Sequence, residues 1–256
     1  MIGQRGIFIK SEQEIAIMRQ AGRINALALA AVREAIRPKV TTAELDQIAA
    51  EVIRKHGARS AFLGVPGAYP YPATTTISIN DEMVHGIPGK RKLQEGDIVS
   101  VDCGTIFEGF VGDSAFTVGV GEVSPVAQRL LEVTEKSLYV GIDHLRPGKH
   151  VGDVGAAIQQ YVEAQGFHLT REYTGHGVGR AMWEGPQVPN YGISGRGAVF
   201  RAGMVIALEP MVLVGTPRTR VLPDQWTVAS ADGTLTAHFE HSVAITQNGP
   251  LVLTIL

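Results

Sequence analysis

The sequence has only one cysteine, Cys103, among its 256 residues, which excludes an internal disulfide. It also lacks an excess of charge of either sign, because 23 Lys and Arg residues stand against 25 Asp and Glu residues. That balance gives no electrostatic reason to expect a nucleic acid or an anionic membrane as partner. We expect Cys103 to be a packed apolar residue in a protein of the reducing cytoplasm.

Long apolar runs and several catalytic motifs are missing as well. No apolar run reaches the ~20 residues that span a bilayer, and the opening MIGQRGIFIK has neither the apolar core nor the cleavage site of a signal peptide. The sequence contains no Walker loop, no G-x-G-x-x-G between a strand and a helix, and no G-x-S-x-G. A membrane protein, a P-loop or dinucleotide-binding enzyme and a serine hydrolase are therefore not expected.

The sequence does contain four segments with helical periodicity. Ser11 with Glu14, and Thr41 with Glu44, have the spacing of a capping box that opens a helix. Helices are predicted at about 12–37, 42–57, 125–145 and 152–166.

The two halves of the chain have similar patterns. A shift of 109 residues carries Ile36-Arg37-Pro38 onto Leu145-Arg146-Pro147, and a shift of 107 carries Gly96–Asp102 onto Gly203–Glu209. Two matches in the same order favour an internal duplication over coincidence. We therefore predict two pseudo-symmetric halves that share one sheet and a site between them.

Five residues that can bind metal ions lie inside or beside short β-like apolar runs. A carboxylate in such a strand is costly unless a cation compensates it. Four carboxylates and one imidazole suit a pair of divalent ions such as Mn, Fe(II), Co or Zn, which would activate a shared water for hydrolysis of a carbonyl or phosphoryl compound. The five residues are Asp102, Asp113, His176, Glu209 and Glu240.

Taken alone, each of these residues except Glu209 has a simpler explanation, and Glu209 between VIAL and Pro210 is less easily explained as a surface residue. Asp102 and Asp113 have the residue type of turns and caps, and His176 stands between two glycines, as loop histidines do. Glu240 at the end of an alternating strand is compatible with a solvent-facing position. Only the joint occurrence of the five favours a shared site.

Six segments together resemble the type I methionine aminopeptidases, a family with the pita-bread fold. The resemblance extends from about Ser11 to Leu256 and implies an α+β fold, in which helices back a curved antiparallel sheet. It implies one catalytic domain over residues 1–256, with neither the insertion of the type II enzymes nor an N-terminal zinc-finger extension. The segments are ISINDEMVHGIP (77–88), GDIVSVDCG (96–104), GDSAFT (112–117), TGHGVGR (174–180), GMVIALEPM (203–211) and AHFEHSVAIT (237–246).

The resemblance implies a dinuclear enzyme that removes the initiator methionine from nascent proteins through a metal-bound hydroxide. Its cofactors would be two divalent ions (Co²⁺, Mn²⁺, Fe²⁺ or Zn²⁺), and its partners chains that emerge from the ribosome; we expect a monomer. Asp102 would chelate one ion, and Asp113 and Glu240 would bridge both. His176 and Glu209 would complete the shell of the other ion.

Two residues would act in catalysis. Glu209 would take a proton from the bridging water and pass it to the leaving amine. His85, in the segment VHGIP, would donate a hydrogen bond to the peptide nitrogen or the developing oxyanion.

The chain departs from the family pattern at Trp183. Residues 175–186 read GHGVGRAMWEGP, and Trp183 stands where the family has a second histidine that contacts the substrate carbonyl. Indole has one N–H donor and no accessible charge. Loss of one such donor typically costs ~10²–10³ in kcat. The enzyme is therefore either impaired or retuned, or Trp183 only packs the pocket wall and the histidine is dispensable.

A second departure lies in the Pro-rich loop 64–76, which is longer than usual for the family. Thr75 or Thr76 stands where relatives have a cysteine near the methionine side chain, and Tyr69 and Tyr71 are either pocket wall or ordinary loop residues. Trp226 matches a pocket tryptophan of the family. A small apolar pocket would select unbranched side chains by size.

Three alternatives remain open. An Xaa-Pro aminopeptidase usually carries an extra N-terminal domain, which we do not expect in this protein. A non-catalytic binding protein on the same scaffold typically loses metal ligands, and all five are kept here. A two-metal phosphatase needs cationic side chains near the metal ligands to bind phosphate, and Arg180 alone is weak evidence for such a site.

Overall fold

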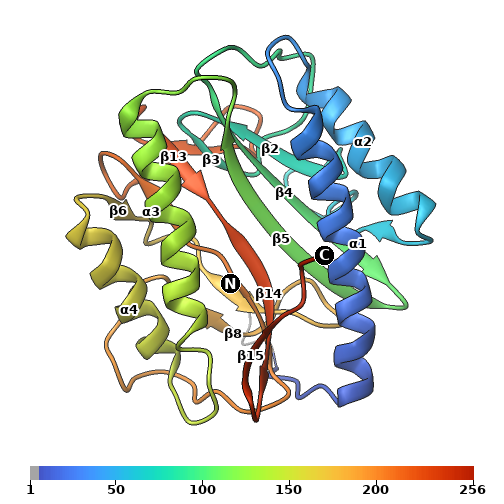
Figure 1. The fold of residues 1–256 in the computed structure, drawn as a ribbon, viewed down its shortest axis with the longest axis vertical. Helices are drawn as coiled ribbons and strands as arrows, with labels where there is room; N and C mark the ends of the chain where they lie inside the picture. The colour runs from blue at the N-terminus through green and yellow to red at the C-terminus, as the bar shows by residue number, and fades with distance from the viewer. Residues whose placement is uncertain (1–5) are drawn as a thin grey trace.

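The computed structural model describes residues 6–256, and within them four helices cover one face of a curved sheet (Figure 1). The first two helices begin as predicted, with Ser11 and Thr41 as N-caps. Each cap side chain accepts the backbone N–H of the glutamate three residues on, whose carboxylate accepts the cap N–H. All four end two or three residues before the predicted ends. The helices are α1 (Glu12–Ala35), α2 (Thr42–Lys55), α3 (Pro125–Ile142) and α4 (Val151–Ala164).

The main sheet has nine strands, and all of its pairings are antiparallel. Its order is β1-β4-β5-β14-β9-β7-β8, with β2 beside β4 and β15 beside β14. This confirms the predicted α+β class with an antiparallel sheet backed by helices. The strands are β1 (Arg59–Ser60), β2 (Thr75–Ile79), β4 (Ile98–Phe107), β5 (Phe110–Gly119), β7 (Gly175–Gly177), β8 (Glu184–Val188), β9 (Val205–Leu208), β14 (Glu240–Thr246) and β15 (Gly249–Val252).

Two small sheets of three strands each complete the described part of the fold. Their orders are β13-β10-β6 and β11-β12-β3. The strands are β3 (Glu82–Val84), β6 (His168–Leu169), β10 (Met211–Leu213), β11 (Thr219–Val221), β12 (Val228–Ser230) and β13 (Thr236–His238).

The order of the main sheet is symmetric about the junction between β5 and β14. β4 lies outside β5 in the first half, and β9 lies outside β14 in the second half. The helices pack in the corresponding pairs, α1 with α2 and α3 with α4, on either side of the junction (Figure 1). The two predicted pseudo-symmetric halves are thus confirmed, and Asp102 on β4 corresponds to Glu209 after β9.

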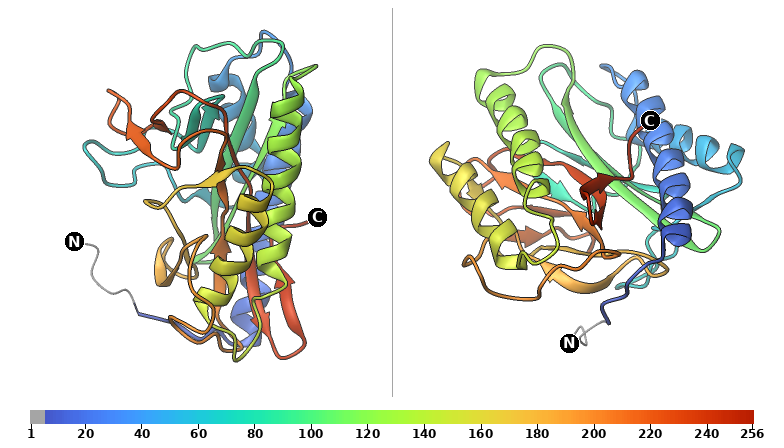
Figure 2. Two further views of the ribbon diagram at one scale, coloured as in Figure 1. Left: turned by 90° about the vertical axis from the view of Figure 1, so that its left-hand side faces the viewer. Right: turned by 60° about the horizontal axis from the view of Figure 1, so that its bottom comes forward.

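The main core lies between the helices and the sheet. In β4, Val99, Val101 and Cys103 belong to a cluster that includes Ala28 and Val32 of α1. Side chains alternate along a strand, so the residues between them point to the opposite face of the sheet. Figure 2 shows in side view that the helices occupy one face. Cys103 is a buried core residue, as predicted.

Helix α1 is long and apolar enough to cross a membrane, judged by length and composition alone. In the structure it lies against α2, β4 and β5. Its buried side chains, among them Ala28 and Val32, join the core, whereas Arg19 and Arg23 are exposed. Packing on the sheet therefore accounts for the apolar face of α1.

The alternating run HFEHSVAIT (238–246) around Glu240 does not form one strand, because it is interrupted at Phe239. His238 pairs with Met211 in a small sheet, whereas Glu240 pairs with Ala115 in the main sheet. The chain changes sheets between the two residues. Glu240 therefore begins a strand, and the prediction that it ends one was wrong.

Candidate metal centre

The strand register places three acidic residues on one face of the main sheet. Asp102 of β4 and Glu240 of β14 both lie opposite Ala115 of β5. Asp113 precedes Ala115 by two residues in the same strand. Paired residues share a face, and so do residues two apart in a strand, so all three carboxylates point the same way.

The packing of Gly112 identifies the face of the sheet on which these three carboxylates lie. A Cβ at Gly112 would lie 2.5 Å from the backbone nitrogen of Gly22 in α1. Only a residue without a side chain allows α1 to pack this closely on β5. Because Gly112 faces the helix, its neighbour Asp113 points to the face away from the helices.

His176 and Glu209 reach the same face from the second half. Ala207 of β9 pairs with both Ser242 of β14 and His176 of β7. Glu209 follows Ala207 by two residues, just as Ser242 follows Glu240 by two. The five predicted residues therefore converge on one side of the sheet although they are far apart in the sequence.

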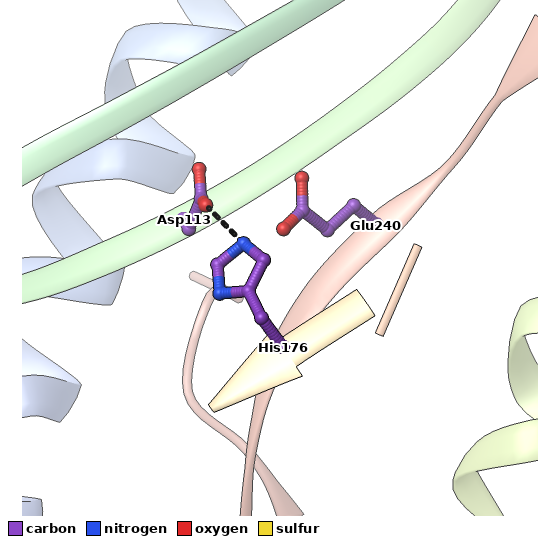
Figure 3. A group of neighbouring side chains, drawn as sticks. All are labelled: Asp113, His176 and Glu240. Carbon is purple, nitrogen blue, oxygen red and sulfur yellow. Dashed lines mark ion pairs between the residues drawn. The ribbon is translucent and has the colours of Figure 1, made fainter. Parts of the chain in front are cut away.

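Three of the five form a compact group. Figure 3 shows Asp113, His176 and Glu240 pointing toward one another from β5, β7 and β14. One potential ligand atom from each lies within 4.8 Å of the others. The His176 Nε2 atom is 3.9 Å from Asp113 Oδ2 and 3.4 Å from Glu209 Oε1. His176 Nδ1 donates to the backbone oxygen of Gly177 at 2.9 Å, which directs Nε2 toward the carboxylates.

The carboxylates lack the partners that buried charges require. Among the described residues, one oxygen each of Asp102, Asp113 and Glu240 is buried without a hydrogen-bond partner. Burial raises the pKa of Asp113 to about 8. Burial, followed by the charge of Asp113, raises the pKa values of Asp102, Glu209 and Glu240. Bound divalent cations would allow all four to ionise, so the donor set fits such ions.

His85 has a constrained position beside this group. Its φ of 62° is uncommon for a residue with a side chain and is typical of strained functional sites. A Cβ on the next residue, Gly86, would lie 2.2 Å from the backbone oxygen of Ile77. The Tyr71 hydroxyl lies 2.9 Å from the Gly86 oxygen and fixes this turn. Burial lowers the pKa of His85 to about 4, so the ring is neutral near pH 7 and has one N–H to donate.

A cavity of about 1040 Å³ opens over the acidic group. Tyr71 and Trp226 form part of its wall, with ring centroids 5.1 Å apart at 77°. Trp226 thus lines the cavity, and its predicted role in substrate binding stays a prediction. Thr76 lines the cavity opposite Asp102, whereas the Thr75 hydroxyl donates to Asp46, so Thr76 is the threonine near the site.

The two tyrosines of the 64–76 loop differ in role. Tyr71 is 3% exposed and belongs to the cavity wall, as one of the two interpretations predicted. Tyr69 is 38% exposed, and its hydroxyl donates to the backbone oxygen of Asp224 at 2.8 Å. Tyr69 therefore supports the loop through its hydroxyl and its edge-on contact with Trp226.

Trp183 lies at the rim of the same cavity. It is 38% exposed, and its ring centroid is 6.5 Å from that of His176. The turn that carries it is anchored by Glu184, whose carboxylate accepts the backbone N–H of Arg180 at 2.9 Å and pairs with Lys10 at 2.5 Å. Its position is compatible with the predicted contact to substrate, and that role stays a prediction.

The sequence interpretation missed His238. This side chain is 2% exposed, and its Nε2 atom lies 3.9 Å from Glu209 Oε2 and 3.9 Å from Glu240 Oε2. The spacing contained a clue, because His238 precedes Glu240 by two residues in an alternating run.

Comparison with known proteins agrees with this geometry. Residues 16–247 match metallopeptidase family M24. A methionine aminopeptidase of Clostridium perfringens is 48% identical over 250 residues, which cover 98% of this chain and 99% of that protein. Methionine aminopeptidase 1 of Bacillus subtilis is 46% identical over 248 residues, with 97% and 99% covered.

Solved structures give the same result. The crystal structure of a methionine aminopeptidase from Thermotoga maritima matches with a TM-score of 0.95 at 44% identity, over 98% of this chain and all of that one. An Xaa-Pro dipeptidase from Bacillus anthracis matches with a TM-score of 0.77 at 23% identity and shares the fold, with 61% of its length covered. The chain therefore belongs to metallopeptidase family M24 and, within that family, to the methionine aminopeptidases.

Proposed function

We propose that this protein removes N-terminal methionine from peptides and nascent proteins by metal-assisted hydrolysis of the first peptide bond. The observation that carries the proposal is the convergence of five predicted ligands on one sheet face, under a cavity, in a methionine aminopeptidase sequence. Three buried carboxylate oxygens there have no partner among the described residues, as expected for ligands of cations.

We assign the centre two divalent ions (Co²⁺, Mn²⁺, Fe²⁺ or Zn²⁺). Asp102 would hold one ion, His176 and Glu209 the other, and Asp113 and Glu240 both. When bound, such ions polarise the substrate carbonyl and lower the pKa of a bound water toward neutrality.

The protein side chains would move and hold the protons. Glu209, which lies at the cavity with a carboxyl pKa raised by burial, would accept a proton from the attacking water and return it to the leaving amine. His85, neutral at pH 7, would donate its N–H to the peptide nitrogen or to the developing oxyanion. The Trp183 indole at the rim would contact the substrate near the carbonyl of the scissile bond.

The apolar part of the cavity would receive the methionine side chain. Phe62, Tyr71 and Trp226 present apolar surface there, and Thr76 borders it near Asp102. Such a pocket discriminates by size, with one methylene worth ~1–3 kcal/mol. A free α-amino group beside the acidic centre would restrict cleavage to chain ends.

The cellular setting is also part of the proposal. We infer a monomer in the cytoplasm that works as one catalytic domain over residues 1–256, on chains that emerge from the ribosome, without nucleic acid or membrane as partner. The near-balance of charge and the single buried cysteine support this setting.

The test is steady-state hydrolysis of Met-Gly-Met after loading with Co²⁺, Mn²⁺ or Fe²⁺. Release of free methionine that EDTA abolishes and that N-acetylation of the peptide blocks supports the proposal. Glu209→Gln is the matched variant and should lose turnover while it stays folded. A metal-loaded protein that cleaves neither this peptide nor other Met-peptides would instead be the non-catalytic binding protein, whereas cleavage of Ala-Pro-Ala in preference would indicate an Xaa-Pro enzyme.

The replacement at Trp183 favours a second candidate, a retuned or impaired aminopeptidase paralogue. Turnover of Met-Gly-Met far below that of another N-terminal residue in a peptide panel would favour the retuned enzyme. Slow turnover of every peptide with full metal loading would favour the impaired one.

A further inference from the structure

His238 is a buried histidine beside the candidate metal centre, and the proposed function assigns it no role. The side chain is 2% exposed, and among residues 6–256 neither ring nitrogen has a hydrogen-bond partner. An unpartnered imidazole in the interior is costly, so its position calls for an explanation.

The backbone of His238 is held firmly, which fixes where the ring can point. The N–H of His238 donates to Thr117 Oγ1 at 2.9 Å, and the Thr117 hydroxyl donates to the oxygen of His238 at 2.7 Å. The residue also pairs with Met211 in the small sheet. These contacts with Thr117 and Met211 hold the backbone of His238 on two sides, so the ring keeps its orientation toward the carboxylates.

His238 lies behind the acidic group and not in front of it. Glu209, Glu240 and His85 line the cavity, whereas His238 does not. A substrate in the cavity would reach the carboxylates first. His238 can therefore act on the reaction only through Glu209 or Glu240.

The two oxygens of Glu209 face two different imidazoles. Oε1 is 3.4 Å from Nε2 of His176, and Oε2 is 3.9 Å from Nε2 of His238. Glu209 follows the end of β9, and its side chain is 15% exposed, so the strand ladder does not hold it. Glu240, equally far from His238, is 2% exposed and paired in the ladder opposite Ala115. Glu209 is the carboxylate that needs an additional support.

We propose that His238 is a positioning residue, which rests on the proposed function: its Nε2–H donates to Glu209 Oε2 and keeps Oε1 turned toward His176 and the metal centre. An N–H···O bond of ~2.9 Å requires the two atoms to approach by about 1 Å, and catalytic hydrogen bonds that are long in a free enzyme often tighten when the substrate binds. A neutral imidazole has one N–H to donate. Supports of this kind are typically worth 10–100-fold in metal affinity or activity.

Two substitutions separate hydrogen bonding from packing. His238→Gln keeps an N–H donor at similar reach, and His238→Leu fills similar space without one. We expect His238→Leu to lower kcat on Met-Gly-Met, or the affinity for Mn²⁺ measured by calorimetry, by ~10–100-fold with little change in KM. His238→Gln should recover most of this loss.

His241 supplies the matched control. It is a histidine of the adjoining strand β14 whose Nδ1 lies 2.8 Å from Thr254 Oγ1, outside the cavity lining. His241→Gln should leave the affinity for Mn²⁺ unchanged. The melting temperature of each variant without metal shows whether it folds, and His238→Met replaces His238→Leu if the latter does not.

Three results would overturn the proposal. One is wild-type kcat and Mn²⁺ affinity in His238→Leu, and another is a His238→Gln variant as impaired as His238→Leu. The third is loss of one bound ion per chain in His238→Leu together with a changed visible spectrum of the Co²⁺ form, which would make His238 a ligand. If the wild type itself has no turnover, the proposed function fails, whereas the Mn²⁺ affinities still decide the role of His238.

Discussion

Trp183 is the residue at which we expect the chemistry of this chain to differ from its family pattern. It lies at the rim of the cavity over the acidic group, with its ring beside His176. A histidine there would provide a donor that can also become cationic. We expect Trp183→His to raise kcat on Met-Gly-Met by roughly 10²-fold, the usual worth of one oxyanion donor. Steady-state kcat and KM with Mn²⁺ measure this effect.

Trp183→Phe is the control for this substitution, because it keeps the aromatic bulk and removes the N–H. A further fall in kcat would mean that the indole already donates, and unchanged kcat would mean that it only packs. If Trp183→His brings no gain in kcat, Trp183 does not limit the reaction.

The direction of a single side chain could be predicted from the sequence where it depends only on the alternation of residues along one strand. Asp102 lies between Val101 and Cys103, which pack toward the helices, so its position away from the core follows from the strand pattern alone. The choice between Thr75 and Thr76 depends on the register of β2 against β4, which no local pattern fixes. His238 was missed because its approach to Glu209 arises from a change of sheet at Phe239.

At the scale of elements, the turn that carries Trp183 depends on a buried ion pair with the N-terminal segment. Lys10 and Glu184 pair at 2.5 Å, and each side chain is 4% exposed. Removal of one partner of such a pair leaves an uncompensated charge in the interior. We expect Lys10→Met to lower the free energy of unfolding by ~3–5 kcal/mol, measured by urea denaturation. The double variant Lys10→Met/Glu184→Gln should lose clearly less of its free energy of unfolding, because it leaves no unpaired charge in the interior.

The pair of Arg91 and Glu82 is a suitable comparison, because its side chains are 49% and 18% exposed. Arg91→Met should cost below ~1 kcal/mol. If Lys10→Met and Arg91→Met lower the free energy of unfolding equally, burial of the Lys10 pair does not contribute to stability.

The start of α4 gives a pH-dependent prediction. Asp153 accepts hydrogen bonds from the Ser194 hydroxyl at 2.5 Å, from the backbone N–H of His150 at 2.7 Å and from that of Gly195 at 2.8 Å. These bonds, the one from Ser194 first, hold the pKa of Asp153 below its ordinary 3.8. The stabilisation is therefore complete above pH 3.8 and is lost as the pH falls through the folded-state pKa.

We expect Asp153→Asn to lower the melting temperature at pH 7 by roughly 2–4 °C, as loss of an N-terminal cap does in a chain of this size. The difference from wild type should shrink when the pH is lowered from 5 to 3. Ser194→Ala should show part of the same behaviour. A difference that stays constant over this pH range would contradict the assignment.

Helices were the elements best predicted from sequence, because their starts are decided by residues three apart, as in Ser11 with Glu14. Strand ends were predicted less well. The interruption at Phe239 occurs because His238 and Glu240 pair with different sheets, and such partners are remote in the sequence.

At the scale of the whole molecule, the internal repeat predicted that two halves share one site. The order β4-β5-β14-β9 places Asp102 and Asp113 from one half beside Glu240 and Glu209 from the other. The pairing of β5 with β14 that joins the halves could not be read from the sequence, because no local feature specifies it. The family resemblance supplied that long-range information.

We propose that five side chains from both halves of the molecule bind two divalent ions. Calorimetric titration of the metal-free protein with Mn²⁺, checked by elemental analysis after dialysis, tests it directly. We predict two ions per chain for the wild type and one for Asp102→Asn, since Asp102 would serve only one ion, with a higher melting temperature in each loaded form. A wild-type chain that binds no Mn²⁺, or an Asp102→Asn variant that binds as many ions with the same affinity, would contradict a two-ion site built from these five residues.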